Sequence, residues 1–158
     1  MKKTIFAFMF SLLLIGCSNS EQTIKEENWE ESATLVKEFV VSDDGQKGDF
    51  VFRIGDNGKF GFGEYGPFIA GEEQKYMWHF WGDDKVLTKS FKVIAVSRET
   101  DEKITIFQES DSSSLNPNIG ADHHIPSSME LTSPGLWRLE AYFGNELFGN
   151  IVVNVKEK

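Results

Sequence analysis

Cysteine is almost absent from this chain: its 158 residues include one, Cys17, and only four prolines. A single thiol excludes an internal disulfide and a cysteine-based metal cluster, so the folded part must be held by its hydrophobic core. Positive charge is also scarce, because 16 Lys and Arg residues stand against 25 Asp and Glu, for a net charge of −9. Such an acidic protein does not attract nucleic acid, and we expect no nucleic-acid partner.

Common enzyme motifs are missing as well. The sequence has no Gly-x-Ser-x-Gly, no His-Glu-x-x-His and no glycine-rich phosphate loop ahead of a helix. We therefore expect a protein that is not an enzyme and that carries no cofactor. A metal-dependent or carboxylate-dependent hydrolase remains an alternative, because acidic residues are abundant and the sequence does not show which of them converge.

Long hydrophobic runs are absent except near the start of the chain. Lys2 and Lys3 precede an apolar run, Ile5–Ile15, which is interrupted only by Ser11. A stable membrane span needs about 20 apolar residues, so this run is too short and has the length of a signal-peptide core. It ends in Leu14–Cys17, Leu-Ile-Gly-Cys, which resembles the lipobox of bacterial lipoproteins.

The lipobox resemblance implies cleavage and a lipid anchor. In that family the bond before the cysteine is cut and the cysteine sulfur takes a diacylglycerol, which requires a small residue before the cut; Gly16 and Cys17 fit. We expect residues 1–16 to be a lipoprotein signal peptide and Cys17 to anchor the protein to the extracytoplasmic face of the cell membrane. Cleavage leaves 142 residues and, without Lys2 and Lys3, a net charge of −11. An ordinary secretory signal with a chance cysteine is the weaker interpretation, since this cysteine is the only one.

Residues 17–33 are predicted to be the lipidated N-terminus and an acidic tether. The stretch is polar and rich in glutamate, namely Glu21, Glu26, Glu27, Glu30 and Glu31. Its large apolar residues are Ile24 and Trp29. As a flexible coil, about 15 residues span roughly 20 Å on average. The alternative is a short helix over Glu26–Phe39.

Residues 34–158 show short apolar runs separated by turn residues, which predicts one all-β domain. The predicted strands are Leu35–Val41, Asp49–Ile54, Lys59–Phe62, Gln74–Trp81, Ser90–Ser97, Lys103–Gln108, Ser128–Leu131, Leu136–Phe143 and Leu147–Val155. No long stretch with the apolar spacing of a helix occurs between them. Many short strands without alternating helices favour an antiparallel β-sandwich over a parallel sheet.

The strand Gln74–Trp81 is apolar on both faces and should lie centrally in its sheet. Alternation places Tyr76, Trp78 and Phe80 on one face and Met77, His79 and Trp81 on the other. Burying an imidazole costs more than burying a phenol or an indole, so the first set should face the core. Either the chain covers the outer face, with the Gly61–Ala70 loop as the expected cover, or His79 and Trp81 contact a ligand or partner there.

The last two strands should form a hairpin whose register follows from its apolar residues. A two-residue loop would place polar residues on the core face, whereas a three-residue loop, Gly144–Glu146, or an equivalent bulge avoids this. The three-residue loop pairs Phe143 with Leu147, Leu139 with Ile151, and Trp137 with Val153. Trp137 is therefore predicted to be buried.

This C-terminal hairpin resembles the last two strands of immunoglobulin-like bacterial envelope domains. Together with Gly66–Gly71 and the Tyr76–Trp81 strand, it resembles a family of small Gram-positive lipoproteins of unassigned function. The resemblance implies an immunoglobulin-like β-sandwich and carries no activity or catalytic residue with it. We expect a non-enzymatic binding or interaction module with an envelope protein or glycan as partner. The alternative is a carbohydrate- or small-ligand-binding protein that uses an aromatic patch.

Asp122, His123 and His124 are the best candidate metal ligands. Adjacent histidines on a strand point to opposite faces, so both would bind one ion only from an irregular loop. No third ligand follows at a spacing typical of zinc sites, and His79 is distant in sequence. We therefore favour two ordinary imidazoles and predict no metal site.

Overall fold

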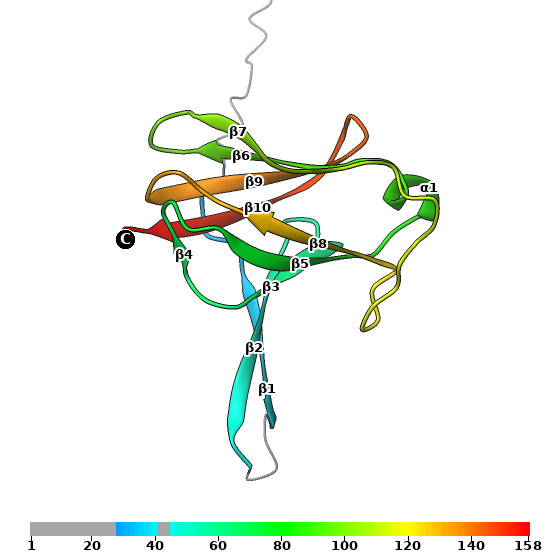
Figure 1. Cartoon of the computed structure of the whole chain (residues 1–158), viewed down its shortest axis with the longest axis horizontal. Helices are drawn as coiled ribbons and strands as arrows, with labels where there is room; N and C mark the ends of the chain where they lie inside the picture. The colour runs from blue at the N-terminus through cyan, green and yellow to red at the C-terminus, as the bar shows by residue number, and fades with distance from the viewer. Residues whose placement is uncertain (1–27, 41–44) are drawn as a thin grey trace, which may run out of the picture.

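The computed structural model describes residues 28–40 and 45–158 (Figure 1). The predicted signal peptide and Cys17 lie outside the described residues. The elements are β1 (Thr34–Val40), β2 (Lys47–Ile54), β3 (Phe60–Glu64), β4 (Phe68–Ile69), β5 (Gln74–Phe80), α1 (Asp84–Leu87), β6 (Phe91–Ser97), β7 (Lys103–Glu109), β8 (His123–Met129), β9 (Gly135–Phe143) and β10 (Glu146–Lys156).

The strands form two five-stranded sheets that pack face to face, as the all-β sandwich prediction requires. The first sheet, sheet A, has the order β1-β2-β3-β5-β8, and sheet B has the order β4-β10-β9-β6-β7. All pairings are antiparallel except that of β4 with β10. β5 pairs with β8 in one sheet, and β9 lies between β6 and β10 in the other, which is the strand arrangement of an immunoglobulin-like sandwich.

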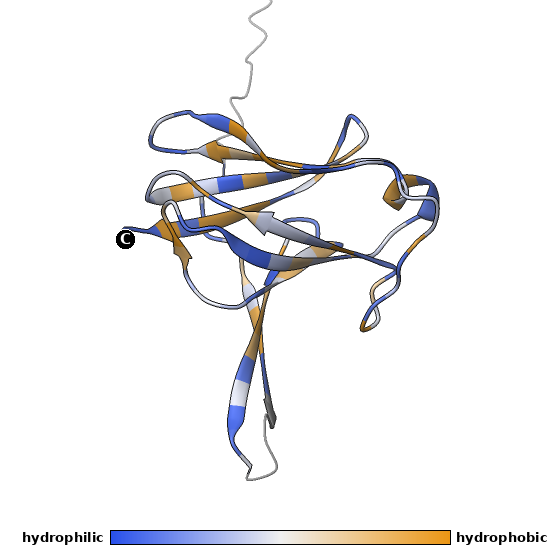
Figure 2. Cartoon of the chain, in the orientation of Figure 1, coloured by the Kyte–Doolittle hydropathy of each residue, from blue (hydrophilic) through white to orange (hydrophobic). Residues whose placement is uncertain are grey.

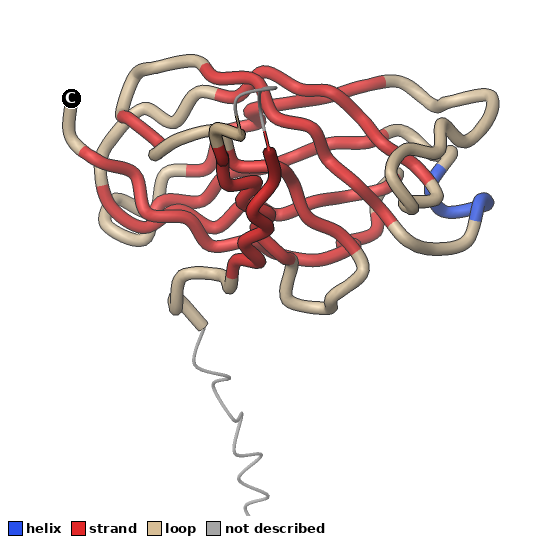
Figure 3. The backbone as a smooth tube through the Cα atoms, turned by 90° about the horizontal axis from the view of Figure 1, so that it is seen from below, coloured by secondary structure: helices blue, strands red, loops and turns tan. Residues whose placement is uncertain are grey.

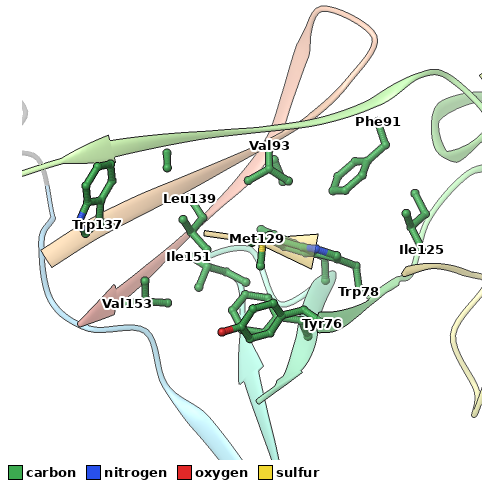
Figure 4. Packing of buried hydrophobic residues seen from close by; sticks show 14 of the residues in the cluster. Tyr76, Trp78, Phe91, Val93, Ile125, Met129, Trp137, Leu139, Ile151 and Val153 are labelled. Atoms are coloured by element: carbon green, nitrogen blue, oxygen red, sulfur yellow. The ribbon is translucent and has the colours of Figure 1, made fainter. Parts of the chain in front are cut away.

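Side chains from both sheets fill the space between them (Figure 4). The largest fully buried side chains are Trp78, Trp137, Phe60, Phe62, Phe80, Phe91 and Phe143. Trp137 lies opposite Val153, as predicted, and its indole N–H donates to the carbonyl of Ser133 at 2.9 Å. This bond satisfies the one polar atom of a ring that is otherwise enclosed by apolar groups.

The β9–β10 hairpin confirms two predicted pairs and, of the two predicted solutions, has the bulge instead of the three-residue loop. Leu139 pairs with Ile151, but the loop has two residues, with Glu146 opposite Phe143 instead of Leu147. A bulge between Leu147 and Gly149 leaves Phe148 as the extra residue and restores the apolar register. The Phe148 ring then closes one end of the core against Phe60, Phe80 and Phe143, at centroid distances of 5.6, 6.0 and 5.3 Å.

Three elements differ from the sequence predictions. β8 covers His123–Met129 rather than Ser128–Leu131, while β4 and α1 were not predicted. Pro126 lies in the middle of β8, which is the edge of sheet A, where a missing backbone N–H is tolerated. Helix α1 is a single turn whose N-cap Asp83 accepts from the backbone N–H of Lys85.

The last residues of the predicted tether contact the domain. Trp29 lies against Arg138 of β9, with the guanidinium carbon 4.8 Å from the ring centroid. Ser32 donates its backbone N–H to Val152 of β10 at 2.9 Å, and Ala33 accepts from Ile54 of β2 at 3.0 Å. The alternative of a helix reaching Phe39 is wrong, because residues 34–40 form a strand.

Candidate functional site

The central strand β5 has the orientation expected from its sequence. Tyr76, Trp78 and Phe80 face the core and are at most 2% exposed. Trp81 follows β5 on the outer side of sheet A and is 36% exposed. His79 also lies on the outer side, but it is only 2% exposed. The outer side of sheet A is therefore partly covered.

The cover comes from β2 and not from the Gly61–Ala70 loop. The ring of Phe52 lies 5.7 Å from the ring of His79 and 6.2 Å from that of Trp81, edge to face in both cases. Gly61 makes this possible, because a Cβ there would lie 2.5 Å from the Phe52 ring and 2.3 Å from the carbonyl of Arg53. The glycines of β3 thus let phenylalanine rings from β2 lie flat across the sheet.

His79 is a structural residue in this arrangement. Its Nδ1 lies 3.1 Å from the carbonyl of Met77, so Nδ1 carries the proton and donates. Its Nε2 is buried and has no hydrogen-bond partner among the described residues. Burial lowers the pKa of His79, and the nearby His124 lowers it further. The expectation that His79 is an exposed contact residue is corrected, because Phe52 covers it.

Around Trp81 the sheet presents a continuous apolar surface, which we call the outer apolar face. Its members are Leu35, Phe50, Phe52, Ile54, Tyr65, Met77, Trp81 and Pro126. Leu35 and Tyr65 are 61% and 68% exposed. Figure 2 shows that apolar residues continue along β1 and β2 where this hairpin leaves the sandwich. An exposed apolar surface of this kind marks a contact site more often than chance.

Two hollows lie on this face. One, of about 340 Å³, is lined by Leu35, Phe52, Ile54, Gly58, Phe60 and Trp81. The other, of about 870 Å³, runs from Tyr65 and Met77 across Pro126 to Phe107 at the edge of sheet B. The smaller hollow, which we call the Trp81 hollow, is lined almost entirely by carbon.

Trp81 is held rigidly beside its hollow. Its indole N–H donates to the carbonyl of Gly120 at 2.7 Å, and its ring contacts Phe52. The polar atom is therefore satisfied inside the protein, while the apolar edge of the ring stays open. Sequence reasoning singled out Trp81 but missed Leu35 and Tyr65, because only the pairing of β1 with β2 and of β2 with β3 brings them to this face.

The structure separates the three candidate metal ligands. His123 is buried toward the core, and its Nδ1 accepts from the backbone N–H of Asn116 at 2.9 Å. His124 lies on the outer side and donates from Nδ1 to the Asn116 carbonyl at 2.7 Å, while Asp122 accepts from the backbone N–H of Gly82. Within residues 28–40 and 45–158, no three His, Cys, Asp or Glu side chains converge on a point.

Mild acid should destabilise the fold through His79 and His123. Burial lowers the pKa of both, and His124 lowers each further, although Glu109 raises that of His123. Unfolded imidazoles titrate near pH 6.5, so below that value the unfolded state binds more protons and the free energy of unfolding falls. Thermal melts from about pH 7.5 to about pH 5.5 should show a falling Tm. His79→Gln should weaken that dependence; a variant with an unchanged slope would contradict the assignment.

These observations define a β-sandwich domain with a rigid, exposed apolar face on one sheet. The chain belongs to the family described as Domain of unknown function (DUF4871), which matches residues 19–153. That match confirms the resemblance to a family of unassigned function. No curated protein matches the chain. No helix in the described part of the chain is long and apolar enough to cross a membrane.

Among solved structures, the fold is similar to the crystal structure of a candidate lipoprotein from Bacillus anthracis. The two share 20% sequence identity with a TM-score of 0.56, and the match covers 84% of this chain and 89% of that one. At this identity the similarity shows the fold.

Proposed function

We propose that this protein is a lipid-anchored, extracytoplasmic binding module without enzymatic activity, which contacts an envelope partner through the outer apolar face. The observation that carries the proposal is that Leu35, Tyr65 and Trp81 are all exposed on the outer side of sheet A, where a hydrogen bond to Gly120 fixes Trp81. The Leu14–Cys17 motif supports the anchor. The description of the Bacillus anthracis protein as a candidate lipoprotein supports it too.

The chemistry of the face favours a protein partner. Tryptophan and tyrosine supply much of the binding energy at protein interfaces, and a ring that is already fixed loses little entropy on binding. Glycan sites require polar groups aimed at hydroxyls. The Trp81 hollow is lined by apolar residues and glycine, and the Trp81 N–H is already donated to Gly120.

The position of Trp29 also supports a partner on the side of the domain that faces away from the membrane. Trp29 packs on Arg138, whose side chain is on the outer side of sheet B. The outer apolar face belongs to sheet A, and the β1–β2 hairpin projects beyond it (Figure 1). A tether that approaches over sheet B would leave the apolar face directed away from the membrane.

Trp81→Ala should weaken partner binding while changing stability little. The variant loses one hydrogen bond and the ring contact with Phe52, and because the ring is 36% exposed the substitution should cost less folding free energy than removal of a fully buried tryptophan. The test uses a photo-crosslinking amino acid at Tyr65 in the lipidated protein in its own membrane, with Thr105 on sheet B as the control position. We expect adducts from position 65 that Trp81→Ala reduces strongly. Equal adducts from both positions would refute the proposal.

Cys17→Ser should abolish the membrane anchor. The lipid forms a thioether that serine cannot make, so the variant should remain an uncleaved or unlipidated precursor. Detergent phase partitioning and the mass of the N-terminal peptide report the outcome. If the serine variant still enters the detergent phase after its first 16 residues are removed, lipidation at this residue is wrong.

A further inference from the structure

The free edge of β1 has a defined set of hydrogen-bonding groups. Ile54 donates to the carbonyl of Ala33, so residues 33, 35, 37 and 39 point their backbone groups toward β2. The N–H and C=O groups of Thr34, Val36 and Glu38 therefore point away from the sheet. Among the described residues none bonds to them, whereas the equivalent N–H of Ser32 is already donated to Val152 of β10.

The other three sheet edges carry features that block further pairing. β8 has Pro126 at its centre, β7 has a bulge opposite Val93 and Ile94, and β4 is only two residues long. β1 is seven residues long and pairs with β2 without a bulge or a proline. Its charged residues are Lys37 and Glu38, and the Glu38 carboxylate pairs with Lys47 of β2 at 2.7 Å. An unprotected edge of this length is the place where a further strand adds.

The free edge and the outer apolar face are adjacent. Leu35 is on β1 and lines the Trp81 hollow, so a strand next to β1 would place one side chain beside Leu35 at the rim of that hollow. The next side chain would lie on the opposite side, beside Val36, which is 62% exposed. Figure 3 views the molecule from below, along the β1–β2 hairpin, which Figure 1 shows projecting from the sandwich.

We propose that β1 docks an extended peptide segment of the partner as a sixth strand of sheet A, with an apolar side chain set against Leu35 at the Trp81 hollow. This proposal rests on the proposed function and specifies the partner's chemistry. A row of alternating N–H and C=O groups is satisfied by another polypeptide backbone, and the hollow selects apolar residues at alternate positions.

A second copy of this chain fits the edge less well. β1 runs away from Ala33 and out past sheet A (Figure 1). A two-fold axis would pair the β1 strands of the two copies antiparallel. The Trp29–Ala33 segments of the two copies would then enter the shared sheet from opposite ends. Two chains anchored in one membrane require both segments on the same side. Parallel self-pairing does not close a dimer.

The test selects binders from a random linear dodecapeptide library displayed on phage, using the lipidated protein in nanodiscs. Val36→Pro removes an outward N–H without removing a bond to β2, whereas the matched control Val36→Thr keeps it. We expect the selected peptides to have alternating apolar residues. Their affinity should fall about tenfold or more in Val36→Pro, and it should stay within about twofold in Val36→Thr.

Amide hydrogen exchange gives a second readout on the wild-type protein, independent of how the proline variant folds. A bound peptide should protect the N–H groups of Thr34, Val36 and Glu38 from exchange. Peptides that lose affinity in Trp81→Ala but protect none of these amides would overturn strand addition and leave the proposed function intact. Strand addition would also be overturned if the library yielded no binding peptide. It would likewise be overturned if Val36→Pro changed only the self-association of the protein.

Discussion

Trp78→Ala should lower the free energy of unfolding by about 3–5 kcal/mol, the usual cost of removing a large buried aromatic side chain. Trp78 is fully buried, and its ring centroid lies 4.8 Å from that of Phe62 and 5.6 Å from that of Phe91. Its indole N–H donates to the hydroxyl of Ser127 at 2.9 Å. The substitution therefore leaves both a cavity between the sheets and a hydroxyl without its donor.

Urea denaturation with tryptophan fluorescence and circular dichroism measures this cost. The matched control is Trp81→Ala, which removes the same side chain from the outer side of the same sheet and should cost distinctly less, because that ring is 36% exposed. The two variants should also differ in partner binding, because Trp78 is fully buried and cannot contact a partner. Equal destabilisation by the two substitutions would mean that the faces of β5 are assigned incorrectly.

Arg53→Ala should cost a similar amount, about 3–5 kcal/mol, because it breaks a buried charge network. Arg53 is 6% exposed; it donates to both carboxylate oxygens of Glu64, at 2.6 and 3.1 Å, and to the carbonyl of Ser32 at 2.8 Å. It also pairs with Glu31 at 2.9 Å. Without the guanidinium, the Glu64 carboxylate, whose side chain is 15% exposed, keeps its charge in a poorly solvated position.

A double variant separates the lost charge pairing from lost packing. Arg53→Met with Glu64→Gln removes both charges and keeps side-chain volume, so it should recover much of the stability that Arg53→Ala loses. Both variants should release Glu31 and remove one bond to Ser32, which keeps its hydrogen bonds with Val152; limited proteolysis near Trp29 would report the loosened segment. A stable Arg53→Ala protein would show that the network contributes little.

Much of the sandwich could be predicted from short-range patterns. Alternation in β5 placed Trp78 inward, and the apolar residues of the last hairpin placed Trp137 opposite Val153. These predictions are correct because every second residue of a strand points to the same face, so a strand with one buried face has apolar residues at alternate positions. The sequence left a three-residue loop and an equivalent bulge open, because the bulge at Phe148 shifts the register in the same way as one extra loop residue; the structure has the bulge.

The candidate site depends on contacts between segments far apart in sequence. Phe52 covers His79 because glycines on the intervening strand β3 leave room for its ring, and neither segment shows this alone. His123 and His124 separate to opposite faces because β8 starts at His123, whereas the sequence predicted a strand only from Ser128.

By itself, the sequence determined the strand-rich composition, the inward face of β5 and the resemblance of Leu14–Cys17 to a lipobox, because each depends on neighbouring residues. Only the tertiary structure decided that β1 is an open edge and that Leu35 and Trp81 line one hollow. Which strand lies at an edge depends on pairings such as Thr34 with Arg53, which join residues distant in sequence. The residue pattern of a strand indicates which of its faces are buried, but it does not indicate which strand lies beside it.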